Sequence, residues 1–135
     1  MFSKEANDFK QQVCDGDVVE AISLLSDLQQ LITENFAILK TEPLPTEKLI
    51  GTELHKLSGA TGLMGLKSLN VFLRYQQDLL DSGKMNINLD YIGGIQERCI
   101  QMVEHYKKII INGSGNIYYL SLIHISEPTR PECIS

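Results

Sequence analysis

The amino-acid sequence predicts an all-α protein, an antiparallel four-helix bundle preceded by a short lead-in helix. Apolar residues recur three or four positions apart through most of the chain, which is the stripe of amphipathic helices. Strand-like alternation is sustained only in the C-terminal tail. Short polar connections separate the stripes, and short connections favour antiparallel neighbours. A length of 135 residues fits one domain with a sizeable core.

The first half of the predicted bundle contains the lead-in helix and the first long helix. The lead-in helix is expected over residues 4–13. Asp17 then begins a long helix as its N-cap, with Glu20 three residues later in a spacing close to that of a capping box. This helix ends near Lys40, because Pro43 cannot continue it. Its apolar stripe consists of Val18, Ile22, Leu25, Leu28, Ile32, Phe36 and Leu39.

Three further helices complete the predicted fold. Thr46 caps the next one, and the helical pattern resumes after residues 59–65 and stops at the glycine of residues 81–83. The last helix is expected from about residue 88 to residue 111, and residues 112–115 close it. The apolar seams of these helices are Ile50, Leu54 and Leu57; then Leu66, Leu69, Leu73, Leu79 and Leu80; then Leu89, Ile92, Ile95, Cys99, Met102, Val103, Tyr106 and Ile110.

The C-terminal tail differs from the rest of the chain. Residues 116–135 break the helical periodicity and share no apolar seam with residues 1–115, which form the predicted domain. The stretch LSLIHISEPTRP resembles translated sequencing-adapter read-through. We therefore interpret residues 116–135 as a non-domain tail that arose by a sequencing or assembly artefact, and we give His124 and Cys133 no functional role.

Composition and charge exclude several classes of function. Twelve Lys and Arg against seventeen Asp and Glu give a net charge of −5 without basic clusters, so no nucleic-acid partner is expected. No apolar run approaches the ~20 residues that span a bilayer, and the N-terminus lacks a signal peptide, so no membrane role is expected. The three cysteines stand far apart without a C-x-x-C motif, which argues against a disulfide framework or a metal site and favours the cytoplasm.

The most informative feature is a histidine surrounded by small residues. If the segment around His55 is helical, the positions three, four and seven residues away lie beside its side chain. Each glycine in a helix costs about 1 kcal/mol relative to alanine, so this helix loses stability and gains space around the imidazole. Lys56 adds a positive charge beside it. The small neighbours are Gly51, Thr52, Ser58, Gly59 and Gly62.

An accessible neutral imidazole can accept a phosphoryl group. It is nucleophilic near pH 7 and forms covalent intermediates. For one ring nitrogen to attack, the other should be held by a hydrogen bond that fixes the tautomer. Gln76 or Gln77, from the following helix, is placed to supply that bond.

The segment HKLSGATGLMGLKSL, residues 55–69, resembles the signature of histidine-phosphotransfer (HPt) domains. It is especially similar to those at the C-terminal end of anaerobic-response hybrid sensor kinases. The resemblance implies a four-helix bundle in which His55 is phosphorylated and Gly59 leaves room beside the phosphohistidine. It also implies that Gln77, twenty-two residues after the histidine, orients the ring. Lys56 would help to neutralise the phosphate.

One position departs from the family pattern. Many members have a lysine three residues after the histidine, where this chain has Ser58. Lys56 and Lys67 are candidate substitutes for its charge. With Gly62 from the small-residue row, the expected binding residues are therefore Lys56, Ser58, Gly59, Gly62 and Gln77.

The resemblance implies a phosphorelay carrier in two-component signal transduction. Its partners would be response-regulator receiver domains and a hybrid histidine kinase, and the expected state of the chain is a monomer. Such a carrier is not an enzyme and holds no cofactor, because the chain has no acidic cluster at metal-ligand spacing. Mg²⁺ would belong to the partner receiver domain, and Leu63 and Met64 would border the docking face.

Two other functions remain as alternatives. A helical adaptor that keeps the fold but cannot be phosphorylated would dock the same receiver or kinase partners. An independent hydrolase or transferase is less well supported, because no acid, base or metal set converges on His55. A phosphate-binding P-loop does not fit, since a leucine stands between Gly65 and Lys67 and no strand precedes them.

Overall fold

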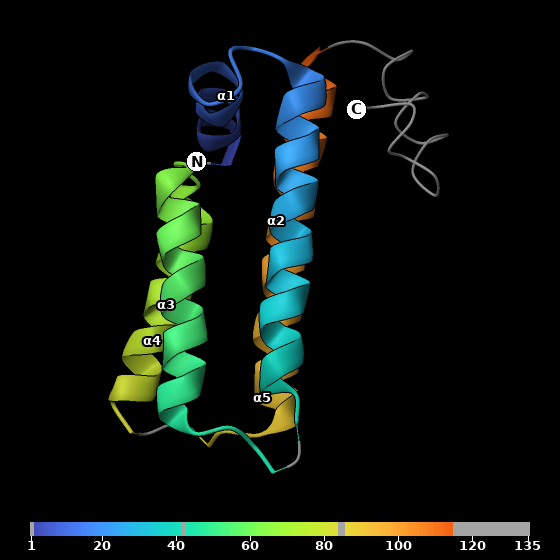
Figure 1. The fold of residues 1–135 in the computed structure, drawn as a ribbon. Helices are drawn as coiled ribbons and strands as arrows, with labels where there is room; N and C mark the ends of the chain where they lie inside the picture. The colour runs from blue at the N-terminus through green and yellow to red at the C-terminus, as the bar shows by residue number, and fades with distance from the viewer. Residues whose placement is uncertain (1, 42, 84–85, 115–135) are drawn as a thin grey trace.

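The computed structural model of the chain describes residues 2–41, 43–83 and 86–114 (Figure 1). Within these residues the chain forms five helices and no strand, which confirms the predicted all-α class. The tail predicted for residues 116–135 lies outside the described residues. The helices are α1 (Phe2–Gln12), α2 (Val18–Leu39), α3 (Glu47–Leu63), α4 (Lys67–Asp81) and α5 (Leu89–Ser114).

Side-chain caps begin three of these helices where the sequence predicted starts. The Asp17 carboxylate accepts a hydrogen bond from the Glu20 backbone N–H at 3.0 Å, and the Thr46 hydroxyl accepts one from Leu49 at 3.1 Å. Asn88 accepts in the same way at 2.8 Å from the backbone N–H three residues later. Each bond satisfies an N–H that has no partner inside the helix, which is worth about 1 kcal/mol.

The last helix is longer than predicted. The sequence placed its end at about residue 111, with residues 112–115 closing it, but α5 continues to Ser114. Ile110 and Ile111 are still buried at this level, where α1 packs against α5. Tertiary packing thus holds the final turn in place across Asn112 and Gly113, two residues that taken alone favour a helix end.

Four of the helices are long rods that lie lengthwise beside one another (Figure 1). The most extensive contacts are those of α3 with α4 and of α2 with α5, so the rods form two pairs. The chain runs down the view in α2, up in α3, down in α4 and up in α5, while α1 lies at the upper end against α5. Apolar side chains from all five helices form one core, including Phe9, Leu25, Ile32, Phe36, Leu54, Leu57, Leu69, Leu73, Val103 and Tyr106.

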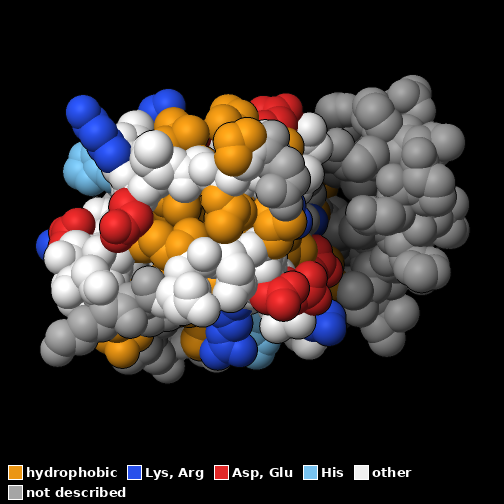
Figure 2. Space-filling view, turned by 90° about the horizontal axis from the view of Figure 1, so that it is seen from below, with side chains coloured by type: hydrophobic (Ala, Val, Ile, Leu, Met, Phe, Trp, Pro, Cys, Tyr) orange, Lys and Arg blue, Asp and Glu red, His pale blue; other side chains and the backbone are white. Residues whose placement is uncertain are grey.

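The lower end of the molecule is apolar. Figure 2 shows hydrophobic side chains gathered at the centre of this end, with charged side chains around them. The structure leaves Ile38 at the end of α2, Leu44 in the following connection, Leu49 in the first turn of α3 and Leu89 at the start of α5 exposed. An exposed apolar patch therefore lies at this end.

The connection between α3 and α4 is a tight turn at Gly65. Its φ of +74° lies in the left-handed region that favours glycine. The Gly65 N–H donates to the Gly62 carbonyl at 3.1 Å and the Leu66 N–H donates to the Thr61 carbonyl at 3.0 Å, which is a Schellman motif. The turn sends α4 back along α3, and this pairing positions the residues discussed below.

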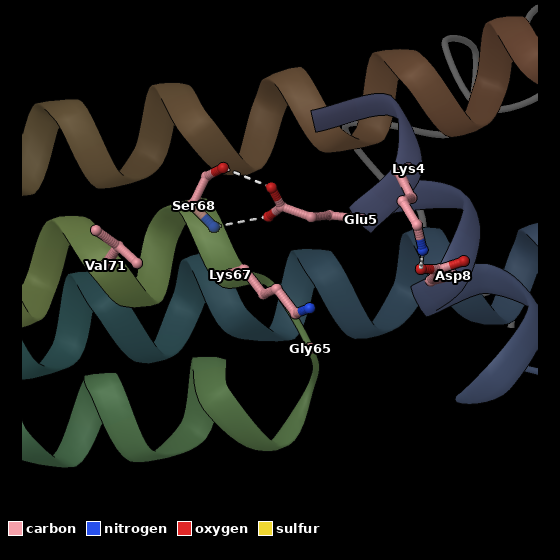
Figure 3. A pocket seen from close by; sticks show the side chains of 7 residues that line it. All are labelled: Lys4, Glu5, Asp8, Gly65, Lys67, Ser68 and Val71. Atoms are coloured by element: carbon pink, nitrogen blue, oxygen red, sulfur yellow. Dashed lines mark hydrogen bonds and ion pairs between the residues drawn. The ribbon is translucent and has the colours of Figure 1, made fainter. Parts of the chain in front are cut away.

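A buried carboxylate joins α1 to the start of α4. Glu5 accepts hydrogen bonds from the Ser68 backbone N–H at 2.7 Å and from the Tyr106 hydroxyl at 2.6 Å. It also accepts one from the Ser68 hydroxyl (Figure 3). The residue at the N-cap of α4, Leu66, has no side chain that can cap, so Glu5 supplies the cap and a negative charge at the positive end of the helix dipole.

The same hydrogen bonds shift two pKa values. Burial by itself would raise the pKa of Glu5, but the bonds from Ser68 and Tyr106 outweigh it and lower this pKa below its ordinary value. Burial, together with the nearby Glu5 carboxylate, raises the pKa of Tyr106. At neutral pH the pair is therefore a carboxylate that accepts from a neutral phenol.

Substituting Glu5 should destabilise the fold in a pH-dependent way. Because the folded-state pKa of Glu5 is lowered, its contribution is full above the pKa of the unfolded chain and is lost as the pH falls through the folded-state value. We expect Glu5→Gln to lower the free energy of unfolding by about 1–3 kcal/mol at pH 7. Urea unfolding of both proteins between pH 3 and pH 7 should show this difference shrinking toward acid.

Asp8 provides the matched control on the same helix. Its carboxylate forms an exposed ion pair with Lys4 at 2.6 Å. Asp8→Asn should change the free energy of unfolding by less than about 1 kcal/mol, because exposed ion pairs contribute little. An equal loss in both variants would contradict a special role for Glu5.

Candidate functional site

His55 lies exposed on α3, beside a depression between this helix and the end of α4. The depression has a volume of about 600 Å³, and its residues come from the first half of α3, the last turns of α4 and the connection that follows α4. His55 and Gln77, which are far apart in sequence, face it together. The full lining consists of Glu47, Lys48, Gly51, Thr52, His55, Gln77, Leu80, Asp81 and Gly83.

The glycines around His55 do two different things. A Cβ atom added at Gly51 or at Gly59 would meet no heavy atom within 4 Å, so these two positions leave open space beside the histidine. A Cβ at Gly62 would lie 3.3 Å from the side-chain nitrogen of Asn70 on α4. Gly62 therefore allows close packing of α4, whereas Gly59 leaves open space beside the imidazole.

Ser58 is buried and connects α3 to α4 next to His55. Its hydroxyl donates to the His55 carbonyl at 3.1 Å and accepts from Gln77 Nε2 at 3.2 Å. Its own carbonyl accepts from Asn70 Nδ2 at 2.6 Å and from the Thr61 hydroxyl at 3.1 Å. Ser58 is thus a buried hydrogen-bonding centre, with only 7% of its surface exposed.

The two glutamines considered from the sequence face different ways. Gln76 is buried and accepts a hydrogen bond from the Tyr91 hydroxyl at 3.0 Å, so it faces α5. Gln77 is half-buried and lines the depression with His55. Among the described residues, no side chain forms a hydrogen bond to the His55 imidazole. The Gln77 amide binds Ser58 instead.

The lysines expected beside His55 do not line the depression. Lys56 forms an ion pair with Glu53 at 3.1 Å, and neither residue lines the depression. Lys67 lines a separate pocket of about 550 Å³ between α1 and α4 (Figure 3). The structure therefore does not bring either lysine together with His55 in the depression.

A cation that the sequence analysis missed, Lys48, lines the depression. It lies seven residues before His55, which is two helical turns along the same face, so the spacing could have identified it. Glu47 and Asp81 line the same depression. Its charge is thus one lysine against two carboxylates, which does not by itself favour an anion.

The described part of the chain contains no group of three or more His, Cys, Asp or Glu side chains arranged to hold a metal ion. Among the helices described, none combines the length and the apolar character needed to cross a bilayer. Comparison of the chain with protein-family models, with curated proteins and with solved structures found no match.

Alanine at the two glycines should separate open space from packing. Gly59→Ala should raise the free energy of unfolding by up to about 1 kcal/mol, because alanine favours the helix and the new Cβ meets nothing. Gly62→Ala should gain less, or lose stability, because Asn70 must shift from its bond to Ser58. Urea unfolding of both variants measures the difference, and a clear loss in Gly59→Ala would contradict the open space.

Proposed function

We propose that this chain is a histidine-phosphotransfer carrier, folded as an antiparallel four-helix bundle with α1 as a short lead-in helix. The single observation that carries the proposal is the exposed His55, which has open space at Gly51 and Gly59 and a depression beside it. The likeness of residues 55–69 to the HPt signature supports it independently. The alternating directions of α2 to α5 also support the proposed bundle (Figure 1).

The proposed chemistry needs a nucleophile that a second protein can reach. A neutral ring nitrogen of His55 attacks the phosphorus of an aspartyl phosphate on a receiver domain. The P–N bond forms as the P–O bond to the aspartate breaks, and the aspartate leaves as a carboxylate. The reverse steps pass the phosphoryl group to another receiver, so the chain is a carrier and not an enzyme.

The charges around His55 indicate what the partner must supply. Lys48 is opposed by Glu47 and Asp81 in the depression, so the site neutralises little of the charge that develops during transfer. A receiver domain with bound Mg²⁺ would provide that neutralisation. Response-regulator receivers and a hybrid histidine kinase are therefore the proposed partners, the cytoplasm is the proposed location and a monomer is the proposed state.

A specific observation favours the adaptor as a second candidate. The two side chains expected to serve a phosphohistidine, Gln77 and Lys56, are bonded to Ser58 and Glu53 respectively. A bundle whose polar side chains are engaged within it could still present the same surface to a receiver. The two functions differ in whether His55 is needed for anything besides binding.

Phosphoryl transfer tests the carrier directly. A receiver domain carrying radiolabelled phosphate should pass label to the wild-type chain, and the label should be acid-labile and base-stable. His55→Gln should abolish it, because no ring nitrogen is left to form the P–N bond. His105→Gln is the matched control, since His105 is also exposed but lies on α5, where its ring packs edge-on against Phe2 at 4.9 Å.

The outcomes are distinct. Label on His55→Gln but not on His105→Gln would place the acceptor elsewhere and refute the assignment. If the wild-type chain takes no label from several receivers, yet wild type and His55→Gln bind them equally well, the adaptor is the correct function.

Charge substitutions in the depression should change the rate of transfer in opposite directions. Lys48→Ala should slow it by about 2- to 5-fold, because an exposed charge contributes up to about 1 kcal/mol. Asp81→Asn should accelerate it by a similar factor, since one carboxylate no longer repels the phosphoryl group. Lys56→Ala is the control with little effect, because Lys56 is paired with Glu53. The rates of the variants should approach the wild-type rate as salt is raised from low to moderate concentration, because salt screens these charges.

A further inference from the structure

We propose that Ser58 is a positioning residue that acts through Gln77 to select the tautomer of His55. It would thereby decide which ring nitrogen takes the phosphoryl group. This inference rests on the proposed carrier function for its consequence. Its physical content, the hydrogen-bonding state of the unphosphorylated ring, can be tested without any phosphoryl transfer.

Ser58 has a single hydroxyl proton to donate. The Ser58 hydroxyl lies 3.1 Å from the His55 carbonyl oxygen, which can only accept. In this geometry the hydroxyl donates its proton to that carbonyl, as is common for serine inside a helix. Toward any other neighbour the hydroxyl has only lone pairs to offer.

The Gln77 side chain meets a lone pair of the Ser58 hydroxyl. Its amide contacts the Ser58 hydroxyl at 3.2 Å, and this contact is a hydrogen bond only if the amide presents its NH₂ group. The amide accordingly lies with Nε2 toward Ser58. The carbonyl oxygen, Oε1, is the end of the amide that turns away from Ser58.

The carbonyl oxygen of Gln77, Oε1, can accept a hydrogen bond. No described residue donates a hydrogen bond to it, and Oε1 is not among the fully buried atoms that lack a partner, so it retains access to solvent. Gln77 and His55 line the same depression. Thr52 also lines the depression, but its hydroxyl donates to the Lys48 carbonyl at 2.9 Å. The side-chain donors left in the depression are the Lys48 ammonium and a ring N–H of His55, and we assign the ring N–H to Oε1.

The consequence is a preference between the two ring nitrogens. A neutral imidazole carries its proton on one nitrogen and a lone pair on the other. If the N–H donates to Gln77 Oε1, the opposite nitrogen keeps its lone pair and becomes the nucleophile. A side chain at position 58 that can only donate, such as lysine, would attract Oε1 to itself and remove this acceptor. The hydroxyl of Ser58 thus favours a ring orientation that a lysine would not.

Nuclear magnetic resonance of the ¹⁵N-labelled, unphosphorylated chain tests the proposal. Long-range ¹H–¹⁵N spectra of the His55 ring, recorded under alkaline conditions in which the ring is neutral, give the ratio of the two tautomers. Gln77→Ala should change this ratio at least about 3-fold, and Ser58→Ala should change it in the same direction, because the amide is then free to rotate. Ser58→Thr keeps the hydroxyl and should restore the wild-type ratio.

A double substitution shows whether Ser58 acts through Gln77. In a chain that already carries Gln77→Ala, the further change Ser58→Ala should leave the ratio unaltered. Thr61→Val is the matched control, because Thr61 is buried one turn away and donates to the Ser58 carbonyl at 3.1 Å without contacting Gln77. It should lower stability, measured by urea unfolding, while the tautomer ratio stays at the wild-type value.

Two results would overturn the inference. One is an unchanged ratio in Ser58→Ala, which would leave Ser58 as a tie between α3 and α4 only. The other is an effect of Ser58→Ala that persists in the Gln77→Ala background. Failure of label transfer, by contrast, would remove the carrier function but not the coupling of Ser58, Gln77 and His55 seen in the spectra. If transfer occurs, wild type should give one phosphohistidine isomer and Ser58→Ala a mixture of both.

Discussion

The pairing of α3 with α4 determines the geometry of the whole candidate site. Gly65 closes the turn between them with a backbone that favours glycine, and Ser58 then bonds two side chains of α4, those of Asn70 and Gln77. These contacts fix the register of the two helices. The register in turn places Gln77 in the depression beside His55, although the two residues stand twenty-two positions apart.

Two glycines shape the candidate site, because they leave open space beside His55. Gly51 and Gly59 leave space that no other residue fills, and each gives up helix stability to do so. The bundle compensates elsewhere, through a continuous apolar core and through polar contacts such as that of Glu5 with Ser68 and Tyr106. A stable scaffold can thus tolerate a locally weak helix beside His55.

The sequence predicted the all-α class and the starts of several helices, because helices depend on local rules. Caps at Asp17 and Thr46 and the spacing of apolar residues follow from the chain itself, and both caps are present in the structure. The end of α5 could not be predicted in the same way. Its last turn is held by α1, a neighbour that lies far away in sequence. The exposure of His55 was foreseen, since its neighbours on the helix face are small.

What the sequence alone determined is the set of helices, the apolar core and a histidine among small residues. The partners of the polar side chains were decided only by the tertiary structure. Lys56 and Glu53 are an exception, because this i,i+3 ion pair lies within α3, and the position of Lys48 two turns before His55 also follows from helical spacing. Gln77 binds Ser58. Periodicity identifies which face of a helix a residue lies on, but a hydrogen bond between helices depends on their register, which packing sets.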